Sequence, residues 1–85
     1  MYTICLPVYN YDICGLVASL VKQALATNVP YEILLIDDAS RSDFVSTNKN
    51  ILQHKNIRFI GLNKNIGRAA IRNLLAQKAQ YEYLI

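Results

Sequence analysis

The chain has few of the residues that catalytic and metal motifs are built from. Its 85 residues include only two cysteines, one histidine and three glycines. Cys5 and Cys14 lack the Cys-x-x-Cys spacing of a redox or metal motif, and His54 has no evident partner. The spacing leaves a disulfide open, but two reduced thiols are favoured. No Ser–His–Asp arrangement, P-loop or Gly-x-Gly-x-x-Gly motif is present. The sequence therefore gives no sign of a catalytic triad, a metal site or a dinucleotide fingerprint.

Long apolar runs and blocks of charge are also missing. No run approaches the roughly 20 residues that span a bilayer, and the N-terminus lacks the layout of a secretion signal. A cytoplasmic protein is therefore expected. The net charge of +3 comes from scattered lysines and arginines, which suits one small anionic ligand and does not call for nucleic acid. With 53% hydrophobic and 18% charged residues, the chain is expected to fold as one small domain.

What the chain does contain is a regular alternation of two patterns. Four apolar runs that end in polar or turn-forming residues are predicted strands: 2–8, 31–36, 57–62 and 81–85. Three segments with apolar residues at spacings of three and four are predicted helices: 13–25, 43–53 and 68–79. Asn10 or Asp12 is the expected N-cap of the first helix, and Asn28 with Pro30 is expected to end it.

This β-α-β-α-β-α-β order predicts an α/β fold. Such units form a parallel sheet through right-handed crossovers, with helices on both faces in a Rossmann-like three-layer arrangement. The expected strand order is 3-2-1-4, which places the topological switch point beside the first strand. The last strand would then be an uncovered edge. We therefore expect residues 1–85 to be part of a longer protein and to self-associate along that edge.

Two of the predicted strands end in residues suited to ligand binding. Ligands of open parallel sheets lie at the carboxyl ends of the strands. Asp37 and Asp38 end the second strand, and because side chains alternate along a strand, the two carboxylates are expected to point in different directions. One would accept hydrogen bonds from a base or ribose, and the other would bind the backbone of the following turn.

The first strand ends in Pro7, Val8 and Tyr9, which would form the other half of a nucleoside site. Tyr9 can lay its ring against a planar base, although covering the end of the first helix is the plainer role for this residue taken alone. Pro7 removes a backbone donor and stiffens the strand's exit. The two strand ends together predict a cradle for a base and its ribose.

A third candidate region is the turn that precedes the last helix. Gly67 follows an Asn-rich turn, and Arg68 and Arg72 lie four residues apart on one helix face near its N-terminus. A helix N-terminus together with a guanidinium suits a diphosphate. A solvated basic face is the plainer alternative, and more so for Arg72 than for Arg68.

Three segments in this order resemble family-2 glycosyltransferases, which have the GT-A fold. The matching segments are ICLPVYN at 4–10, EILLIDDAS at 32–40, and NKNIG at 63–67 followed by AAIRN at 69–73. The resemblance implies an enzyme that transfers a sugar from a nucleotide diphosphate donor, usually a UDP-sugar, to a hydroxyl with inversion. It also implies that Pro7 to Tyr9 contact the base, that Asp38 accepts from the uracil N3–H, and that the Gly67 turn with Arg68 and Arg72 approaches the donor.

The resemblance further implies what such an enzyme uses beyond this chain. Family members hold Mn²⁺ or Mg²⁺ on the diphosphate with an Asp-x-Asp motif and use a later carboxylate as general base; neither motif occurs here. No catalytic residue and no metal ligand is therefore assigned, and the chain alone is expected to be inactive. The acceptor would be a saccharide, lipid or glycan in polysaccharide biosynthesis at the cell envelope, with the full-length protein peripheral to the inner membrane face.

Two rival interpretations fit the same alternating pattern. A non-catalytic nucleotide-binding module or a receiver domain also gathers carboxylates at strand ends, but a receiver places its acidic pair after the first strand. A sugar-activating nucleotidyltransferase has a Gly-rich basic loop after the first strand. Here the first strand is followed by Tyr9, Asn10, Tyr11 and Asp12, which is neither pattern.

Overall fold

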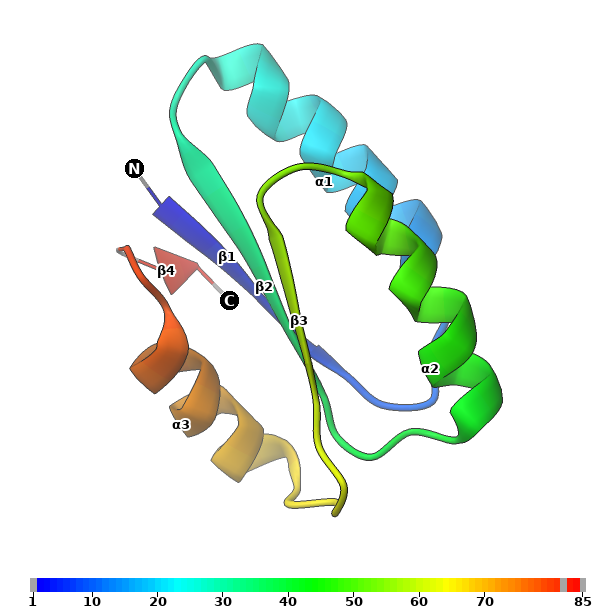
Figure 1. Cartoon of the computed structure of the whole chain (residues 1–85). Coiled ribbons are helices and arrows are strands. Elements are labelled where there is room, and N and C mark those ends of the chain that lie inside the picture. The colour runs from blue at the N-terminus through cyan, green and yellow to red at the C-terminus, as the bar shows by residue number, and fades with distance from the viewer. Residues whose placement is uncertain (1, 82, 85) are drawn as a thin grey trace.

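The computed structural model describes residues 2–81, 83 and 84, the last two by their backbone alone. Figure 1 shows a sheet with helices on both of its faces. The elements in chain order are β1 (Tyr2–Val8), α1 (Cys14–Thr27), β2 (Tyr31–Asp37), α2 (Ser42–Asn48), the 3-10 helix η1 (Lys49–Gln53), β3 (Ile57–Gly61), α3 (Arg68–Lys78) and β4 (Tyr83–Leu84). The strands lie in the order β3-β2-β1-β4, and the pairings among them are parallel. The predicted α/β class is confirmed.

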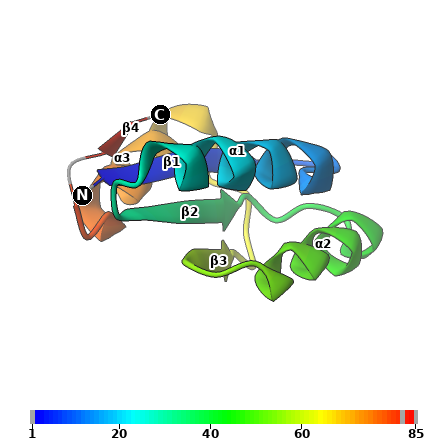
Figure 2. The same ribbon diagram turned by 90° about the horizontal axis from the view of Figure 1, so that it is seen from above.

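The central strand β2 separates two apolar clusters. All of its residues are buried, and their side chains alternate between the faces of the sheet. Ile33 and Leu35 pack in a cluster with α1 and η1, whereas Leu34 and Ile36 pack in a cluster with α3. Seen from two directions, α1 and α2 lie on one side of the sheet and α3 on the other (Figures 1 and 2). This continuous apolar run is typical of a strand covered on both faces.

The strands β1, β2 and β3 end level with one another on the side of the predicted site. Val8 of β1 is paired with Asp37 of β2, and Asp37 is paired with Gly61 of β3. Two backbone bonds continue the pairing into the loops: Asp38 N donates to the Val8 carbonyl at 2.8 Å, and Leu62 N donates to the Asp37 carbonyl at 2.9 Å. The register therefore brings the loops after β1 and β2 together at one edge.

The segment 43–53 is not the single helix that its pattern predicts. The α-helix ends at Asn48, and η1 follows it. Asn48 is fully buried, and its side-chain amide bonds outside its own helix: Oδ1 accepts from Ile13 N at 2.9 Å, and Nδ2 donates to the Tyr11 carbonyl at 2.7 Å. Asparagine is a poor helix former because its amide competes for backbone groups. The prediction of one continuous helix was wrong because the Asn48 side chain bonds to the backbone of the loop before α1.

The start of α1 also differs from the prediction. Ile13 occupies the N-cap position and no side chain caps the helix there. Asp12 instead accepts from Cys14 N at 3.0 Å, and Asn10 bonds to a different loop. The other end agrees with the sequence: Asn28 is the C-cap, in the left-handed conformation with φ of 58°.

At the opposite end of the sheet, a buried carboxylate links neighbouring strands through hydrogen bonds and an ion pair. Glu32 is 5% exposed, accepts from Thr3 Oγ1 at 3.2 Å and forms an ion pair with Arg58 Nε. The same guanidinium donates to the Lys78 carbonyl at the end of α3. A buried charge is tolerated when it is paired and hydrogen-bonded. This network joins three strands and α3 far from the predicted site.

Helices of the described part of the chain are all too short or too polar to cross a bilayer.

Candidate functional site

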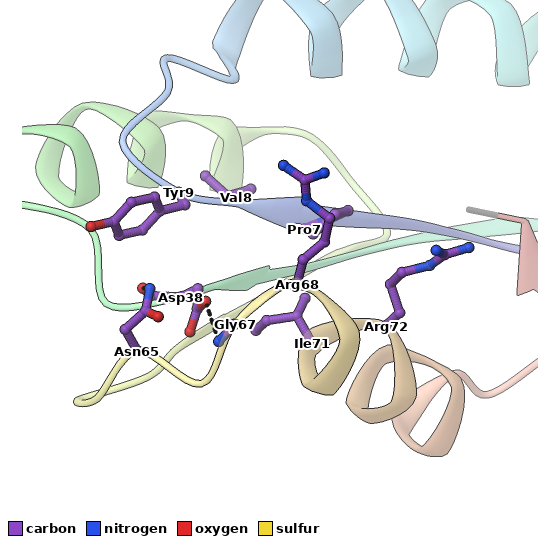
Figure 3. A pocket seen from close by; sticks show the side chains of 9 residues that line it. All are labelled: Pro7, Val8, Tyr9, Asp38, Asn65, Gly67, Arg68, Ile71 and Arg72. Carbon is purple, nitrogen blue, oxygen red and sulfur yellow. Dashed lines mark hydrogen bonds between the residues drawn. The ribbon is translucent and has the colours of Figure 1, made fainter.

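A cavity of about 600 Å³ opens where β1 and β2 end and α3 begins (Figure 3). Its volume lies within the range of small-molecule and cofactor sites. Seven of the eight residues predicted to bind a nucleotide line it, together with two others. The lining consists of Pro7, Val8, Tyr9, Asp38, Asn65, Gly67, Arg68, Ile71 and Arg72.

Asp38 forms the floor of this cavity and joins its two sides. The residue is 5% exposed, and its carboxylate accepts two backbone bonds, from Ile66 N to Oδ1 at 2.7 Å and from Gly67 N to Oδ2 at 3.0 Å. Asn65 Nδ2 also donates to the Asp38 carbonyl at 3.0 Å. A carboxylate offers about four lone-pair sites, so two bonds leave acceptor capacity for a ligand N–H.

The start of α3 provides the positive side of the cavity. Gly67 precedes the helix with φ of +87°, a backbone conformation that side chains other than glycine rarely adopt. No side chain caps α3, so the first N–H groups of the helix point outward without an intrahelical acceptor. Arg68 and Arg72 are exposed and both line the cavity. Arg68 extends from α3 toward Pro7, whereas Arg72 extends from the next turn of the helix and points away from Pro7 and Val8 (Figure 3). A helix N-terminus with two guanidinium groups attracts anions.

The end of β1 and the first residue of the loop after it form the opposite wall. Val8 is 2% exposed and belongs to the core, whereas Pro7 is exposed and presents an apolar ring without an N–H donor. Tyr9 is 56% exposed and lies beside the cavity mouth. An exposed aromatic ring next to a polar floor is suited to stacking against a flat ligand.

The structure does not bring Asp37 into this cavity. Its carboxylate lies on the α1 and α2 side of the sheet and accepts from Ser40 N at 2.8 Å and from Ser40 Oγ at 2.6 Å. It lines a second cavity of about 660 Å³ between α2 and the end of β3. The two carboxylates thus diverge as the alternation predicts: that of Asp37 bonds to the following turn, and that of Asp38 lines the first cavity.

The sequence profile of glycosyl transferase family 2 matches residues 3–85, nearly the whole chain. The chain belongs to this family. No match was found among curated proteins.

Several solved structures share the fold of this family member. The crystal structure of residues 1–349 of S. aureus TarS is 24% identical, with a TM-score of 0.76 over 98% of this chain and 26% of that one. The complex of the same protein with UDP gives 24% identity, a TM-score of 0.73 and the same coverage. The mannosyltransferase PcManGT from Pyrobaculum calidifontis, in complex with GDP-Man and Mn²⁺, is 18% identical, with a TM-score of 0.66 over 89% of this chain and 23% of that one.

The chain thus spans about a quarter of the length of these neighbours. The fold it shares with them is that of part of a GT-A domain. The profile match establishes the family, and the structural matches establish the fold.

A divalent metal is implied by the family, and the described residues do not supply a site for it. No group of three or more His, Cys, Asp or Glu side chains comes together within residues 2–81. Asp38 contributes the carboxylate that lines the cavity, and both of its oxygens already accept backbone N–H groups. These residues therefore do not fit a divalent cation.

Sequence reasoning missed two residues of the cavity, Asn65 and Ile71. Asn65 was recognised only as part of a turn, yet its amide holds the Asp38 carbonyl. Ile71 is 1% exposed and was assigned only to the apolar face of α3. The position of Ile71 one turn after Gly67 was the available signal, because the first turn of a helix that begins at a strand edge borders the same site.

Proposed function

We propose that the chain forms the donor-binding part of an enzyme that transfers a sugar from a nucleotide diphosphate, a UDP-sugar, to a hydroxyl with inversion. The observation that carries this proposal is the cavity that unites an exposed aromatic ring, a buried carboxylate and two arginines at a helix N-terminus. Family membership and the UDP complex of a neighbour with the same fold support it.

The base end of the donor is assigned to Tyr9 and Asp38. The Tyr9 ring is free to stack on a pyrimidine, and the Asp38 carboxylate has acceptor capacity for the uracil N3–H. Cytosine has no proton at N3, so the same carboxylate would face another acceptor there. This arrangement favours uracil over cytosine.

The diphosphate end is assigned to the N-terminus of α3. Helix N-termini bind phosphate through free N–H groups and the positive end of the helix dipole. Arg68 and Arg72 border the same cavity one helical turn apart, so they can contact successive phosphate oxygens. The donor would therefore extend from Tyr9 along the cavity to α3.

The residues of this cavity bind the donor and take no assigned part in the chemical step. Inverting transfer needs a base at the acceptor hydroxyl and charge neutralisation on the departing diphosphate. We propose that residues outside the described range supply both functions. The acceptor is proposed to be a saccharide or a lipid-linked hydroxyl.

Calorimetric titration of the intact protein with UDP, GDP, ADP and uridine tests the proposed function. UDP is expected to bind most tightly, uridine more weakly because it lacks the phosphates, and the purine nucleotides weakest. A protein that binds ADP as tightly as UDP, or binds none of the four, would contradict the proposal. Release of UDP from a panel of UDP-sugars then identifies the sugar.

A further inference from the structure

A chain of hydrogen bonds links Asp37 to the loop that carries Tyr9. Asp37 accepts the hydroxyl proton of Ser40 at 2.6 Å, and Ser40 Oγ in turn accepts from Asn10 N at 2.8 Å. The Asn10 side chain completes the link, because its Oδ1 accepts from Arg41 N at 2.9 Å. Each of the two loops, after β1 and after β2, thus donates one hydrogen bond to the other.

The backbone at this junction adopts the left-handed conformation in both loops. Asn10 has φ of 48° and Ala39 has φ of 58°. Asparagine tolerates this region, but alanine has a steric penalty there and keeps the conformation only where surrounding contacts impose it. Asp37 imposes it on the second loop by accepting both the N–H and the hydroxyl of Ser40.

The far end of the Tyr9 loop is also anchored. Buried Asn48 accepts from Ile13 N and donates to the Tyr11 carbonyl. Tyr9 itself is different, because the residue is 56% exposed and none of the aromatic pairs found within residues 2–81 includes it. The position of the ring therefore depends on the backbone of the next residue, Asn10, which Ser40 holds.

We propose that Ser40 is a positioning residue for the nucleotide base, which it serves through Asn10 and Tyr9 without touching the ligand. The inference rests on the proposed function, in which Tyr9 stacks on uracil. Asp37 belongs to the same device, since it orients the Ser40 hydroxyl toward Asn10 N. The two adjacent carboxylates thus have different roles. Asp38 faces the ligand, and Asp37 holds the loop that carries Tyr9, on which the ligand stacks.

The value of such a device is preorganisation. A loop that is already held in its binding conformation loses less conformational freedom when the ligand arrives. Removing the Ser40 hydroxyl leaves Asn10 N without its acceptor and frees the Tyr9 loop to move. Loss of the Ser40 hydroxyl should therefore lower the affinity for the base, and it should do so only while the Tyr9 ring is present.

A double-mutant cycle on uridine affinity tests this coupling. The Ser40→Ala variant is expected to bind uridine about fivefold more weakly than the wild type, the size of one lost hydrogen bond. Ser40→Thr retains the hydroxyl and is expected to restore affinity. In a Tyr9→Ala background, Ser40→Ala should cause no further loss. Ser46→Ala, which removes an exposed hydroxyl from α2, is the matched control and should bind as the wild type does.

The outcomes separate the two proposals. A wild type that binds neither UDP nor uridine would overturn the proposed function and the positioning role together. A wild type that binds uridine, with Ser40→Ala equal to Ser46→Ala or additive with Tyr9→Ala, would overturn the positioning role alone. Should Ser40→Ala fail to fold, Asn10→Gly keeps the test open, because glycine accepts the positive φ but loses the bond to Arg41. That variant should show the same weakening and the same dependence on Tyr9.

Discussion

Asp38, the residue after β2, accepts the backbone N–H of Gly67, the residue before α3, at 3.0 Å. This bond and its companion from Ile66 N at 2.7 Å tie the start of a helix to the end of a strand almost thirty positions earlier, and they do so with one buried carboxylate. The two sides of the cavity are therefore held by the residue that forms its floor. In the proposed function, ligand binding and local stability are therefore coupled at Asp38.

Replacing Asp38 should cost both stability and nucleotide affinity. Asp38→Ala leaves two backbone N–H groups without acceptors, and we expect it to lower the free energy of unfolding by about 2–4 kcal/mol. Asp38→Asn keeps one acceptor oxygen and should lower the free energy of unfolding by a smaller amount. Urea unfolding at neutral pH measures the difference. Asp43→Ala is the control, since Asp43 is exposed and its pair with Arg41 should contribute less than about 1 kcal/mol. Equal stability of Asp38→Ala and Asp43→Ala would show that the carboxylate does not hold α3.

Removing either arginine at the start of α3 should weaken binding of the phosphates and leave binding of the nucleoside unchanged. We expect Arg68→Ala and Arg72→Ala each to lower UDP affinity about tenfold, because each would remove a charge-assisted bond that the proposed function assigns to phosphate. Uridine affinity should stay the same, since uridine lacks phosphate. Lys64→Ala, an exposed cation outside the cavity lining, is the matched control. Equal losses for UDP and uridine would place the arginines away from the diphosphate.

Ala39→Gly should stabilise the protein, contrary to the usual effect of glycine. Ala39 has φ of 58°, where an L-residue carries a steric cost that glycine avoids. After the extra freedom of glycine in the unfolded chain is subtracted, a gain of about 0.5 kcal/mol is expected. Ala18→Gly, at an exposed position of α1, should instead cost about 1 kcal/mol. Thermal unfolding of the pair measures the contrast, and a loss at both positions would argue against the left-handed turn.

The two thiols should differ from free cysteine in their response to pH. Partial burial raises the pKa of Cys14, and the hydrogen bond and charge of Asp12 raise it further. A raised pKa means less thiolate at a given pH, so alkylation of Cys14 at about pH 8 should be slower than that of free cysteine. Asp12→Asn should speed it up. Cys5 is fully buried, and burial raises the pKa of its thiol, so it should react only on unfolding. Labelling of both thiols at the free rate would contradict this packing.

The fold was predictable because its signals are local and repeated. The seven-residue run of β2 and the three-and-four spacing of α1 and α3 are each decided by which side chains can be buried. Asn48 shows where such signals fail. Asn48 ends α2 by bonding to Tyr11 and Ile13, which lie far from it in the sequence. The local spacing of apolar residues does not reveal these two contacts.

The sequence predicted which strand ends border the cavity. It did not predict the hydrogen bonds between the loops that follow them. Alternation along β2 correctly separated Asp37 from Asp38, because neighbouring side chains must face opposite sides of the sheet. Nothing in the sequence indicated that Asp38 would already bind the turn at Gly67, or that Ser40 would connect Asp37 to Asn10. These contacts depend on how two loops meet in space.

Mapping the bound nucleotide by backbone NMR tests the central proposal most directly. When UDP is titrated into the isotope-labelled protein, the amides of Tyr9, Asp38, Gly67 and Arg68 are expected to shift together and to saturate at one affinity. Shifts confined to Ser42, Ser46 and Lys49 around the second cavity, or none at saturating UDP, would contradict the assignment of donor binding to this edge of the sheet.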